Sequence, residues 1–398
     1  MKKIVLFGAF DRYNYGDNLM PVLFQLFVEK YARHIFNDFE FEYVAISSSN
    51  LEKYSCYKTI SINSIVNTLP SGSVIVVVGG EVLCCRNQSL FLHMQNSQFH
   101  HFFLKVFKKL LPRIFNWYAK SQYATYWEFP FIPLKSFFAH DIKVVFNTVG
   151  GDMSNLTQDE LNDIKERIIS SDYFSVRDKR TFNSFKSLGK ETVLAPDSAY
   201  IMSDIINAKD LTAKISEPFL DRLPKSYFVF QAAPTKIGYS VKKCIFYIQE
   251  LSKQAGQKVV LLPIGYASGH DDLYLLQKVH KALPENTVLL HNLTLWEIMY
   301  VIMKSKIYFG TSLHGAITAM SYSVPHFGLN RKITKLDEFL KDWSVYPFHQ
   351  CYPLEDMAKL PALITDQNIA NLTSKTTANI GKVKANYEQI LQNIDNPN

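Results

Sequence analysis

Residues 306–315 read KIYFGTSLHG, an apolar run that ends in two hydroxyl side chains, a histidine and a glycine. The apolar start predicts a buried strand over 306–310, and apolar residues at helical spacing follow over 315–322. A buried strand that leads directly into a helix is typical of a parallel sheet covered by helices. Ligands bind at the carboxyl ends of the strands in such sheets, so residues 311–315 lie where a binding site is expected.

The same alternation of strands and helices extends along the chain in both directions. Strands are predicted over residues 3–8, 41–46, 74–79, 143–149, 173–176, 192–195, 227–231, 258–264, 287–290, 306–310 and 326–329. Helices are predicted over residues 18–33, 158–169, 179–188, 240–255, 271–283, 295–304, 315–322 and 382–394. The pattern dissolves over 202–225, where Pro218 and Pro224 occur. We therefore predict an α/β fold of two Rossmann-like domains with parallel sheets and an active site in the cleft between them.

The composition excludes several classes of protein. The chain has 398 residues, of which 47% are hydrophobic, 14% aromatic and 20% charged, with a formal net charge of +7. Such a chain is neither disordered nor of low complexity, and its length is sufficient for two cores. Five cysteines without a CxxC pair indicate reduced thiols, so we expect no disulfide framework and no metal site. No nucleic-acid-binding module is recognisable, so we expect no nucleic-acid partner.

A cytoplasmic location is expected from the apolar segments. The first apolar run, residues 4–10, is too short for a signal peptide and is followed by Asp11-Arg12. No charge-free run reaches the roughly 18 residues that span a bilayer.

One segment has the pattern of a helix that lies on a membrane. Apolar residues recur at helical spacing over 99–115, and residues 99–120 contain five Lys or Arg and no Asp or Glu. Pro112 is expected to break or kink this helix. The pattern fits peripheral contact with the inner face of the cell membrane, and it fits equally an internal helix that covers a sheet.

Two motifs follow strands in the first half of the chain. In the loop 11–17, Gly16 permits a tight turn, Asp17 or Asn18 can cap the next helix, and the amides can bind an anion. A plain capped turn explains this loop equally well. Residues 175–178 read SVRD, which places Arg177 at the carboxyl end of a strand, where a guanidinium can bind a carboxylate or phosphate. The alternative for Arg177 is a salt bridge with Asp178 or Asp197.

The second half contributes the segment 311–315. Two hydroxyls, the imidazole of His314 and the amides of a helix N-terminus together suit an anion, and His314 is expected to titrate near neutrality and donate a proton. A buried structural histidine is the alternative. After the next strand, one of Arg331, Lys332 and Lys335 is expected to complete a cationic pocket, unless the three form a solvated face. Residues 270–272, HDD, start a helix and either cap it or reach sugar hydroxyls.

Other catalytic motifs are absent from the sequence, but three ordered segments resemble the polysaccharide pyruvyl transferases. There is no Walker loop, no GxSxG and no HExxH. Residues 14–17, NYGD, resemble the N-x-G-D loop of that family, and SVRD with Pro196-Asp197 resembles its S-V-R-D…P-D segment. Residues 312–315, SLHG, followed by Val324-Pro325, resemble its L-H-G…V-P segment. This chain has Ser312 where many members have Arg, and Gly79-Gly80-Glu81 where a glycine triplet is common.

The resemblance implies a fold like that of GT-B glycosyltransferases. It also implies transfer of pyruvyl from phosphoenolpyruvate to a sugar diol of a lipid-linked precursor of a cell-surface polysaccharide, such as an exopolysaccharide or capsule. The product is a pyruvate ketal. The N-terminal domain (1–205) then serves the acceptor and the C-terminal domain (225–375) the donor, and a helix in 376–398 packs back on the N-terminal domain.

Roles for the candidate residues follow from this reaction. We expect His314 to protonate the methylene carbon, and Asp17 or His270 to take a hydroxyl proton. The expected donor-binding residues are Arg177, Thr311, Ser312, Gly315 and Lys335, and the expected acceptor-binding residues are Asn14, Gly16 and Asp271. No cofactor is expected beyond phosphoenolpyruvate as co-substrate. Two other functions fit the same sequence: a glycosyltransferase that uses a nucleotide sugar, and a non-catalytic scaffold in a glycan-assembly complex.

Overall fold

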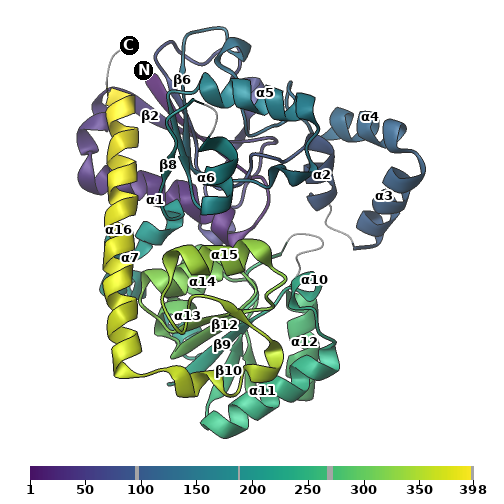
Figure 1. The fold of residues 1–398 in the computed structure, drawn as a ribbon, viewed down its shortest axis with the longest axis vertical. Coiled ribbons are helices and arrows are strands. Elements are labelled where there is room, and N and C mark those ends of the chain that lie inside the picture. Colours follow the sequence, from purple (N-terminus) through teal and green to yellow (C-terminus); the bar gives the residue numbers. More distant parts are fainter. Residues whose placement is uncertain (95–97, 187–188, 267–271, 396–398) are drawn as a thin grey trace.

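The chain forms two parallel β-sheets, one above the other, each covered by helices (Figure 1). The computed structural model describes residues 1–94, 98–186, 189–266 and 272–395. The sheet of the N-terminal domain has the order β3-β2-β1-β4-β6-β7-β8, with β5 beside β6, and the sheet of the C-terminal domain has the order β11-β10-β9-β12-β13-β14. The predicted fold class, α/β with two Rossmann-like domains, is confirmed.

The central strands of the N-terminal sheet are buried along their whole length. All residues of β4 and β6 are enclosed, which explains why both read as continuous apolar runs rather than as alternating patterns. The strands are β1 (Lys2–Phe7), β2 (Phe39–Ala45), β3 (Ile60–Ser61), β4 (Val74–Val77), β5 (Gly80–Glu81), β6 (Lys143–Gly150), β7 (Tyr173–Val176) and β8 (Val193–Leu194). The helices are α1 (Tyr15–Tyr31), α2 (Asn87–His93), α3 (Gln98–Leu110), α4 (Pro112–Gln122), α5 (Gln158–Ile169) and α6 (Lys179–Phe185).

The C-terminal domain follows the predicted alternation most closely. Three short helices, α7 (Met202–Ile205), α8 (Ala208–Thr212) and α9 (Glu217–Leu220), lead into it. Its strands are β9 (Tyr227–Gln231), β10 (Lys258–Leu261), β11 (Thr287–Leu289), β12 (Ile307–Gly310), β13 (His326–Leu329) and β14 (Cys351–Tyr352). Its helices are α10 (Pro234–Ile237), α11 (Val241–Ala255), α12 (Leu273–Ala282), α13 (Leu295–Lys304), α14 (Leu313–Ser321) and α15 (Thr334–Trp343).

Helix ends show where local sequence rules held and where they failed. A capping box formed by Thr157 and Glu160 starts α5, the helix predicted over 158–169. Pro112 separates α3 from α4, as the sequence predicts, and takes the first position of α4. The prediction that Asp17 or Asn18 caps the first helix is wrong, because Asn14 accepts the amide of Gly16 and α1 starts three residues earlier. No helix of the described residues is both long and apolar enough to cross a bilayer.

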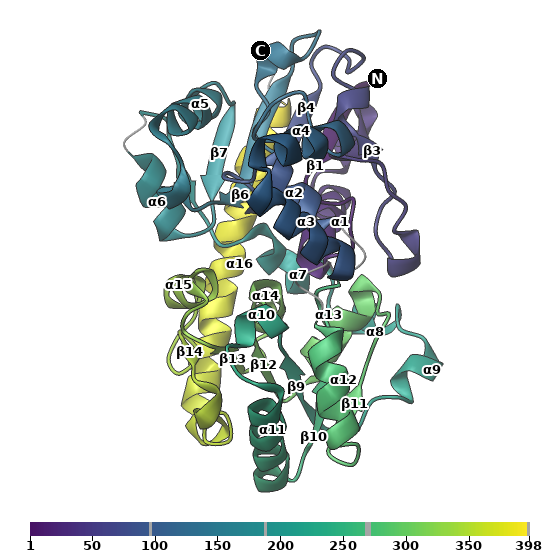
Figure 2. The same cartoon turned by 90° about the vertical axis from the view of Figure 1, so that its right-hand side faces the viewer.

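The last helix, α16 (Asp366–Asp395), runs along both sheets (Figures 1 and 2). It is longer than the predicted 382–394. Near its start Leu372 packs into the core of the C-terminal domain. Near its end Asn386 donates to Asn147 Oδ1 of β6 (2.8 Å) and accepts from the Tyr173 hydroxyl of β7 (2.9 Å). This helix therefore ties the two domains together.

The contact of α16 with the N-terminal sheet predicts a stability effect. Asn386 and Asn147 are fully buried. Asn386→Ala therefore leaves Asn147 Oδ1 without its donor, at a cost of about 1–3 kcal/mol. We expect a lower midpoint of thermal unfolding. Asn371→Ala, on an exposed turn of the same helix, is the matched control and should change stability by less than about 0.5 kcal/mol. Equal midpoints for both variants would contradict this role of α16.

Candidate active site

A cavity of about 320 Å³ lies between the two domains, at the carboxyl ends of both sheets. Loops after β1, β4 and β7 form one wall, and loops after β9, β10, β12 and β13 form the other. Its polar and charged lining residues are Arg12, Asn14, Asp17, Glu81, Ser89, Arg177, Gln231, Lys236, Asp272, Ser312, His314 and Lys335. This is the position in which open α/β sheets bind their ligands.

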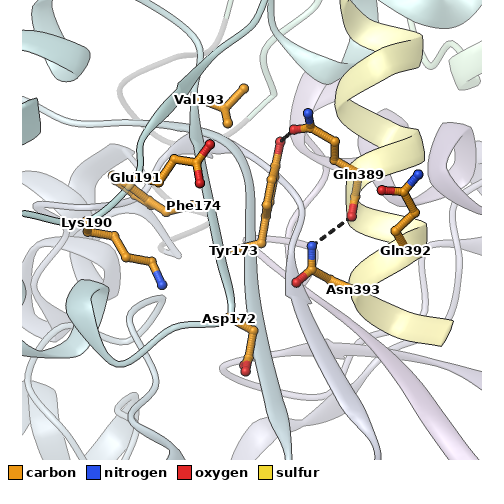
Figure 3. Close-up of a pocket in the computed structure, with 9 residues that line it drawn as sticks. All are labelled: Asp172, Tyr173, Phe174, Lys190, Glu191, Val193, Gln389, Gln392 and Asn393. Carbon is orange, nitrogen blue, oxygen red and sulfur yellow. Dashed lines mark hydrogen bonds between the residues drawn. The ribbon is translucent and has the colours of Figure 1, made fainter. Parts of the chain in front are cut away.

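A second cavity, of about 360 Å³, is a weaker candidate (Figure 3). It lies between α16 and the amino ends of β7 and β8, and is lined by Asp172, Tyr173, Phe174, Lys190, Glu191, Val193, Gln389, Gln392 and Asn393. The Tyr173 hydroxyl is held by Gln389 (2.9 Å), as Figure 3 shows, and Lys190 donates to the backbone of Ser171. The amino ends of parallel strands seldom carry a site, and these polar groups bind one another.

His314 lies at the centre of the interdomain cavity and packs against the backbone of Gly16. A Cβ atom placed on Gly16 would lie 1.8 Å from His314 Nδ1, so no other residue fits at position 16 while the imidazole stays in place. The sequence suggested a tight turn for Gly16. The structure instead places it in the first turn of α1, without a positive φ, where its lack of a side chain leaves room for the imidazole.

The surroundings of His314 favour its neutral form. Burial has the largest influence and lowers the pKa of His314, and the positive charges of Arg177 and Lys335 lower it further. Asp197 and Asp17 oppose this decrease, and Asp197 Oδ2 lies 3.8 Å from His314 Nε2. Nε2 is enclosed and has no hydrogen-bond partner among the described residues. The pKa of His314 is therefore shifted below the ordinary value on which the expectation from the sequence rests.

Arg177 is held by carboxylates rather than left free for a ligand. Its guanidinium donates to Glu81 Oε2 (2.6 Å) and Asp197 Oδ2 (3.0 Å), and only 2% of the side chain is exposed. The salt bridge with Asp197, which the sequence left open, is present. Burial disfavours the charge, but Glu81 and the neighbouring aspartates outweigh it and raise the pKa of Arg177. Arg177 lines the cavity, and its main effect is to fix these carboxylates.

Glu81 is the residue that replaces the last glycine of the common triplet. It follows Gly79 and Gly80, whose φ angles of +108° and +91° are in the region that favours glycine. Its second oxygen accepts from Arg180 (2.7 Å). Burial opposes its ionisation, but Arg177, Lys335 and Arg180 lower the pKa of Glu81 to about 2. Glu81 therefore stays ionised and neutralises part of the positive charge on this wall.

Two lysines on the opposite wall lie near carboxylates of the described residues without forming a salt bridge with them: Lys335 lowers the pKa of Glu81, and Asp272 and Asp17 oppose the decrease in the pKa of Lys236. Lys236 of α10 and Lys335 of α15 both line the cavity, and neither ammonium makes an ion pair with a described residue. Burial, together with the charge of Lys335, lowers the pKa of Lys236 to about 8. Lys335 was predicted from the sequence, whereas Lys236 was missed. Its position just after β9, at the carboxyl edge of the sheet, is the signal that identifies it.

The start of α14 is fixed by Gln231, the last residue of β9. Gln231 Oε1 accepts the amides of Thr311 (3.0 Å) and Ser312 (2.8 Å), and Ser312 accepts the amide of Gly315. Among the described residues no group accepts from the amides of Leu313 and His314, so these two remain available at the positive end of the helix.

Thr311 and Gly315 do not line the cavity, unlike Ser312, so their expected contact with the donor is not supported. The Thr311 hydroxyl accepts the amide of Ala233 (3.1 Å) and holds the loop after β9. Gly315 leaves room for Tyr308, whose hydroxyl would lie 2.0 Å from a Cβ at that position. Both residues therefore shape the loop around His314 without facing the cavity.

The remaining predicted residues divide into two groups. Asn14 and Asp17 line the cavity from the first turn of α1. His270 and Asp271 lie outside the described residues. Their neighbour Asp272 is buried, accepts from Gln231 Nε2 (2.7 Å) and from the amide of Gly265 (3.1 Å), and so organises the loop after β10. Among the described residues no group of three or more His, Cys, Asp or Glu side chains is placed to hold a metal ion.

Several solved structures with a similar fold are UDP-GlcNAc 2-epimerases. The UDP-GlcNAc 2-epimerase from Neisseria meningitidis, bound to UDP-GlcNAc, has a TM-score of 0.55 at 12% identity, and the match covers 99% of this chain and 99% of that chain. A putative UDP-N-acetylglucosamine 2-epimerase from Listeria monocytogenes has a TM-score of 0.54 at 12% identity, with 98% and 94% covered. The UDP-GlcNAc 2-epimerase from Methanocaldococcus jannaschii has 0.53 at 11%, with 98% and 99% covered. At such identities these likenesses show the GT-B type of fold alone.

Comparison with families of known proteins identifies the chain more closely. No curated protein sequence matches it. The family model described as polysaccharide pyruvyl transferase matches residues 14–332, a span that starts at the Asn14 cap and includes the loops that carry Arg177, Lys236 and His314. The resemblance drawn from the three sequence motifs is therefore confirmed: the chain belongs to the polysaccharide pyruvyl transferase family.

Proposed function

We propose that the protein transfers the pyruvyl group of phosphoenolpyruvate to two hydroxyls of one sugar in a lipid-linked polysaccharide precursor, in the cytoplasm. The product is a cyclic pyruvate ketal. The observation that carries this proposal is the convergence, in one interdomain cavity, of His314 with two lysines that form no salt bridge with a described residue and with the open amides at the start of α14.

The charges of the cavity suit a small, multiply charged anion. Lys236 and Lys335 lie on the same wall as the amides of Leu313 and His314, so a phosphate and a carboxylate can each meet cationic or amide donors. Many members of the family carry Arg at the position of Ser312. Here Lys236 places a positive charge in the same cavity, which supports phosphoenolpyruvate as the donor despite that substitution.

His314 is the proposed acid. Nε2 is enclosed, lies 3.8 Å from Asp197 Oδ2 and makes no hydrogen bond with a described residue, whereas Nδ1 lies against Gly16. The anionic donor would offset the positive charges of Arg177 and Lys335, and so would raise the pKa of His314, which these charges lower. Binding of the donor thereby protonates the residue that the reaction needs in its protonated form.

The reaction then balances without a further reagent. His314 gives a proton to the methylene carbon, which becomes a methyl group and leaves an oxocarbenium-like C2. One sugar hydroxyl forms a C–O bond to C2 and loses its proton, and the second hydroxyl displaces phosphate from C2 and loses its proton. One of the two released protons returns His314 to its charged form, and the other leaves on hydrogen phosphate. Asp17, on the N-terminal wall, is the proposed acceptor of a hydroxyl proton, and Asn14 beside it is placed to bind the acceptor sugar.

The first prediction concerns His314. His314→Gln should lower phosphate release from phosphoenolpyruvate, in the presence of acceptor, by about 10²–10⁴-fold, because the general acid is lost. Phosphoenolpyruvate should still bind. At pH 7, calorimetry in buffers of different ionisation enthalpy should show proton uptake on binding in the wild type and none in the variant.

His280→Gln is the matched control for this change, since His280 lies on α12 away from the cavity and should leave turnover unchanged. Wild-type turnover in His314→Gln would contradict the assignment. If the wild type consumed a nucleotide sugar but no phosphoenolpyruvate, the protein would be a glycosyltransferase. If the wild type turned over neither phosphoenolpyruvate nor a nucleotide sugar, the protein would be a non-catalytic scaffold.

The second prediction concerns Gly16. Gly16→Ala should displace the imidazole of His314 and reduce turnover by about 10²-fold, with a smaller effect on donor binding. Gly381→Ala is the matched control because its Cβ meets no atom within 4 Å on an open turn of α16. That change should leave turnover unaffected and raise stability by about 0.5–1 kcal/mol. A fully active Gly16→Ala enzyme would show that the close approach is not required.

The third prediction concerns Lys236. Lys236→Met should weaken phosphoenolpyruvate binding by about 10–100-fold, since a hydrogen-bonded charge is lost, whereas Lys332→Met, on an exposed neighbour of the cavity, should not. Only the ammonium form binds the anion, so the affinity should fall as the pH rises through about 8, the pKa of Lys236. Lys236→Arg should keep its affinity above that pH. A pH profile shared by wild type and Lys236→Arg would contradict this role.

A further inference from the structure

The helical hairpin α3–α4 exposes an apolar surface that the fold does not use. Figure 1 shows both helices projecting from the side of the N-terminal domain, away from its sheet. The exposed side chains are Phe103 (59%), Leu110 (71%), Ile114 (53%) and Trp117 (72%), together with Val106 and Leu111. These six residues are called the hairpin patch below. Single exposed apolar residues are ordinary, but six gathered on one hairpin indicate an interaction surface.

The patch is separate from the side of the hairpin that packs on the domain. Phe107 and Phe115 pack edge to face (5.7 Å), and Phe115 also meets Phe91 of α2 (6.2 Å). These inward-facing residues belong to the core of the N-terminal domain. The hairpin is thus firmly attached through one face, so the patch is a fixed outer face rather than a loosened part of the core.

The charges around the hairpin patch indicate which kind of partner this surface binds. Residues 99–120 contain five Lys or Arg and no acidic residue. Arg113 and Lys120 lie one helical turn from Trp117 (i−4 and i+3), and Lys109 lies one turn from Val106 (i+3). Lys105, Lys109 and Arg113 are exposed, while Lys120 pairs with Glu128. An apolar strip with tryptophan, bordered by cations, is complementary to a bilayer surface that presents anionic headgroups over acyl chains.

A second copy of the chain is a poorer partner. A two-fold dimer through this patch would place the same basic residues of both copies against each other, with no acidic residue on the hairpin to neutralise them. Like charges that face each other across an interface oppose association. An anionic surface has no such cost.

The location of the patch links it to the cavity. α2 packs against both α3 and α4, and Ser89 and Leu90 of α2 line the cavity. At the end of α4, the Tyr123 hydroxyl donates to Asp11 Oδ2 (2.6 Å), next to the cavity residue Arg12. The hairpin therefore lies beside the N-terminal wall of the cavity, where the acceptor sugar is proposed to bind.

We infer that the hairpin patch binds the surface of an anionic lipid bilayer, with its apolar side chains inserted at the headgroup boundary and its cations on the phosphates. A bilayer in this position brings lipid-linked glycans to the N-terminal wall. The membrane binding itself does not depend on phosphoenolpyruvate being the donor.

Vesicle co-sedimentation of the full chain, without donor or acceptor, tests this inference. The wild type should bind vesicles of phosphatidylcholine and phosphatidylglycerol and bind pure phosphatidylcholine weakly. Leu110→Glu with Trp117→Glu should reduce binding by about tenfold or more. Lys105→Gln, Lys109→Gln and Arg113→Gln should each reduce it by about fivefold, and salt should do the same. Phe246→Glu is the matched control, because Phe246 is 56% exposed on α11 of the other domain, and should bind as the wild type does.

Tryptophan fluorescence locates the contact. The chain has four tryptophans, and Trp117 is the one that is strongly exposed. Anionic vesicles should shift its emission to shorter wavelength, and Trp117→Phe should abolish the shift while keeping most of the binding. All substituted side chains are at the surface, so unchanged thermal midpoints show intact folding. Undiminished vesicle binding by the Leu110→Glu, Trp117→Glu variant would overturn the inference, as would wild-type self-association without lipid that this variant abolishes.

Discussion

The packing of His314 against Gly16 is the contact on which the site depends. The imidazole comes from the first turn of α14 in one domain, and the glycine from the first turn of α1 in the other. Because a side chain at position 16 would occupy the space of the ring, the distance between two helix N-termini is set by this contact. Nearby, Tyr15 and Thr318 share a hydrogen bond (2.8 Å), and Trp343 donates to the backbone of Arg177 (2.8 Å). Together with α16, these contacts fix the positions of the two walls of the cavity relative to each other.

The distribution of charge follows from the same arrangement. On the N-terminal wall, Arg177 and Arg180 are matched by Glu81 and Asp197, and this network is mostly buried. A buried ion pair contributes little net stability, but it fixes side-chain positions. On the C-terminal wall, neither Lys236 nor Lys335 forms a salt bridge with a described residue. The overall excess of +7 in the sequence therefore says little about the site, where the local charge depends on the positions of individual cations and carboxylates.

The sequence predicted the fold well because its signals are local. Strands such as 143–149 and 306–310 are continuous apolar runs, and Thr157 with Glu160 marks a helix start without any tertiary information. It also placed Asn14, Asp17, Ser312, His314 and Lys335 around one cavity, because loops at the carboxyl ends of parallel strands converge. The short strands β3, β5 and β14 were missed, since two residues carry no periodicity.

The roles of the site residues were harder to predict, because they depend on distances between domains. SVRD left Arg177 either as an anion ligand or as the partner of Asp178 or Asp197, yet Glu81, which lies 96 residues away in the chain, also binds its guanidinium. Gly16 gave a turn-like signal, although its function is to make room for a ring from residue 314. Lys236 belongs to a four-residue helix and forms no motif. Such contacts appear only once both sheets are in place.

The lowered pKa of His314 has a consequence for the proposed reaction. A permanently charged imidazole would pair with Asp197, 3.8 Å away, and such a pair would hold the proton more tightly than the reaction requires. A neutral imidazole that gains its proton only when an anion binds does not form this tight ion pair. The same burial that disfavours the charge also excludes water, which would otherwise hydrolyse an oxocarbenium-like intermediate. In the proposed reaction, the enclosure of His314 between two domains would serve both proton delivery and protection of the intermediate.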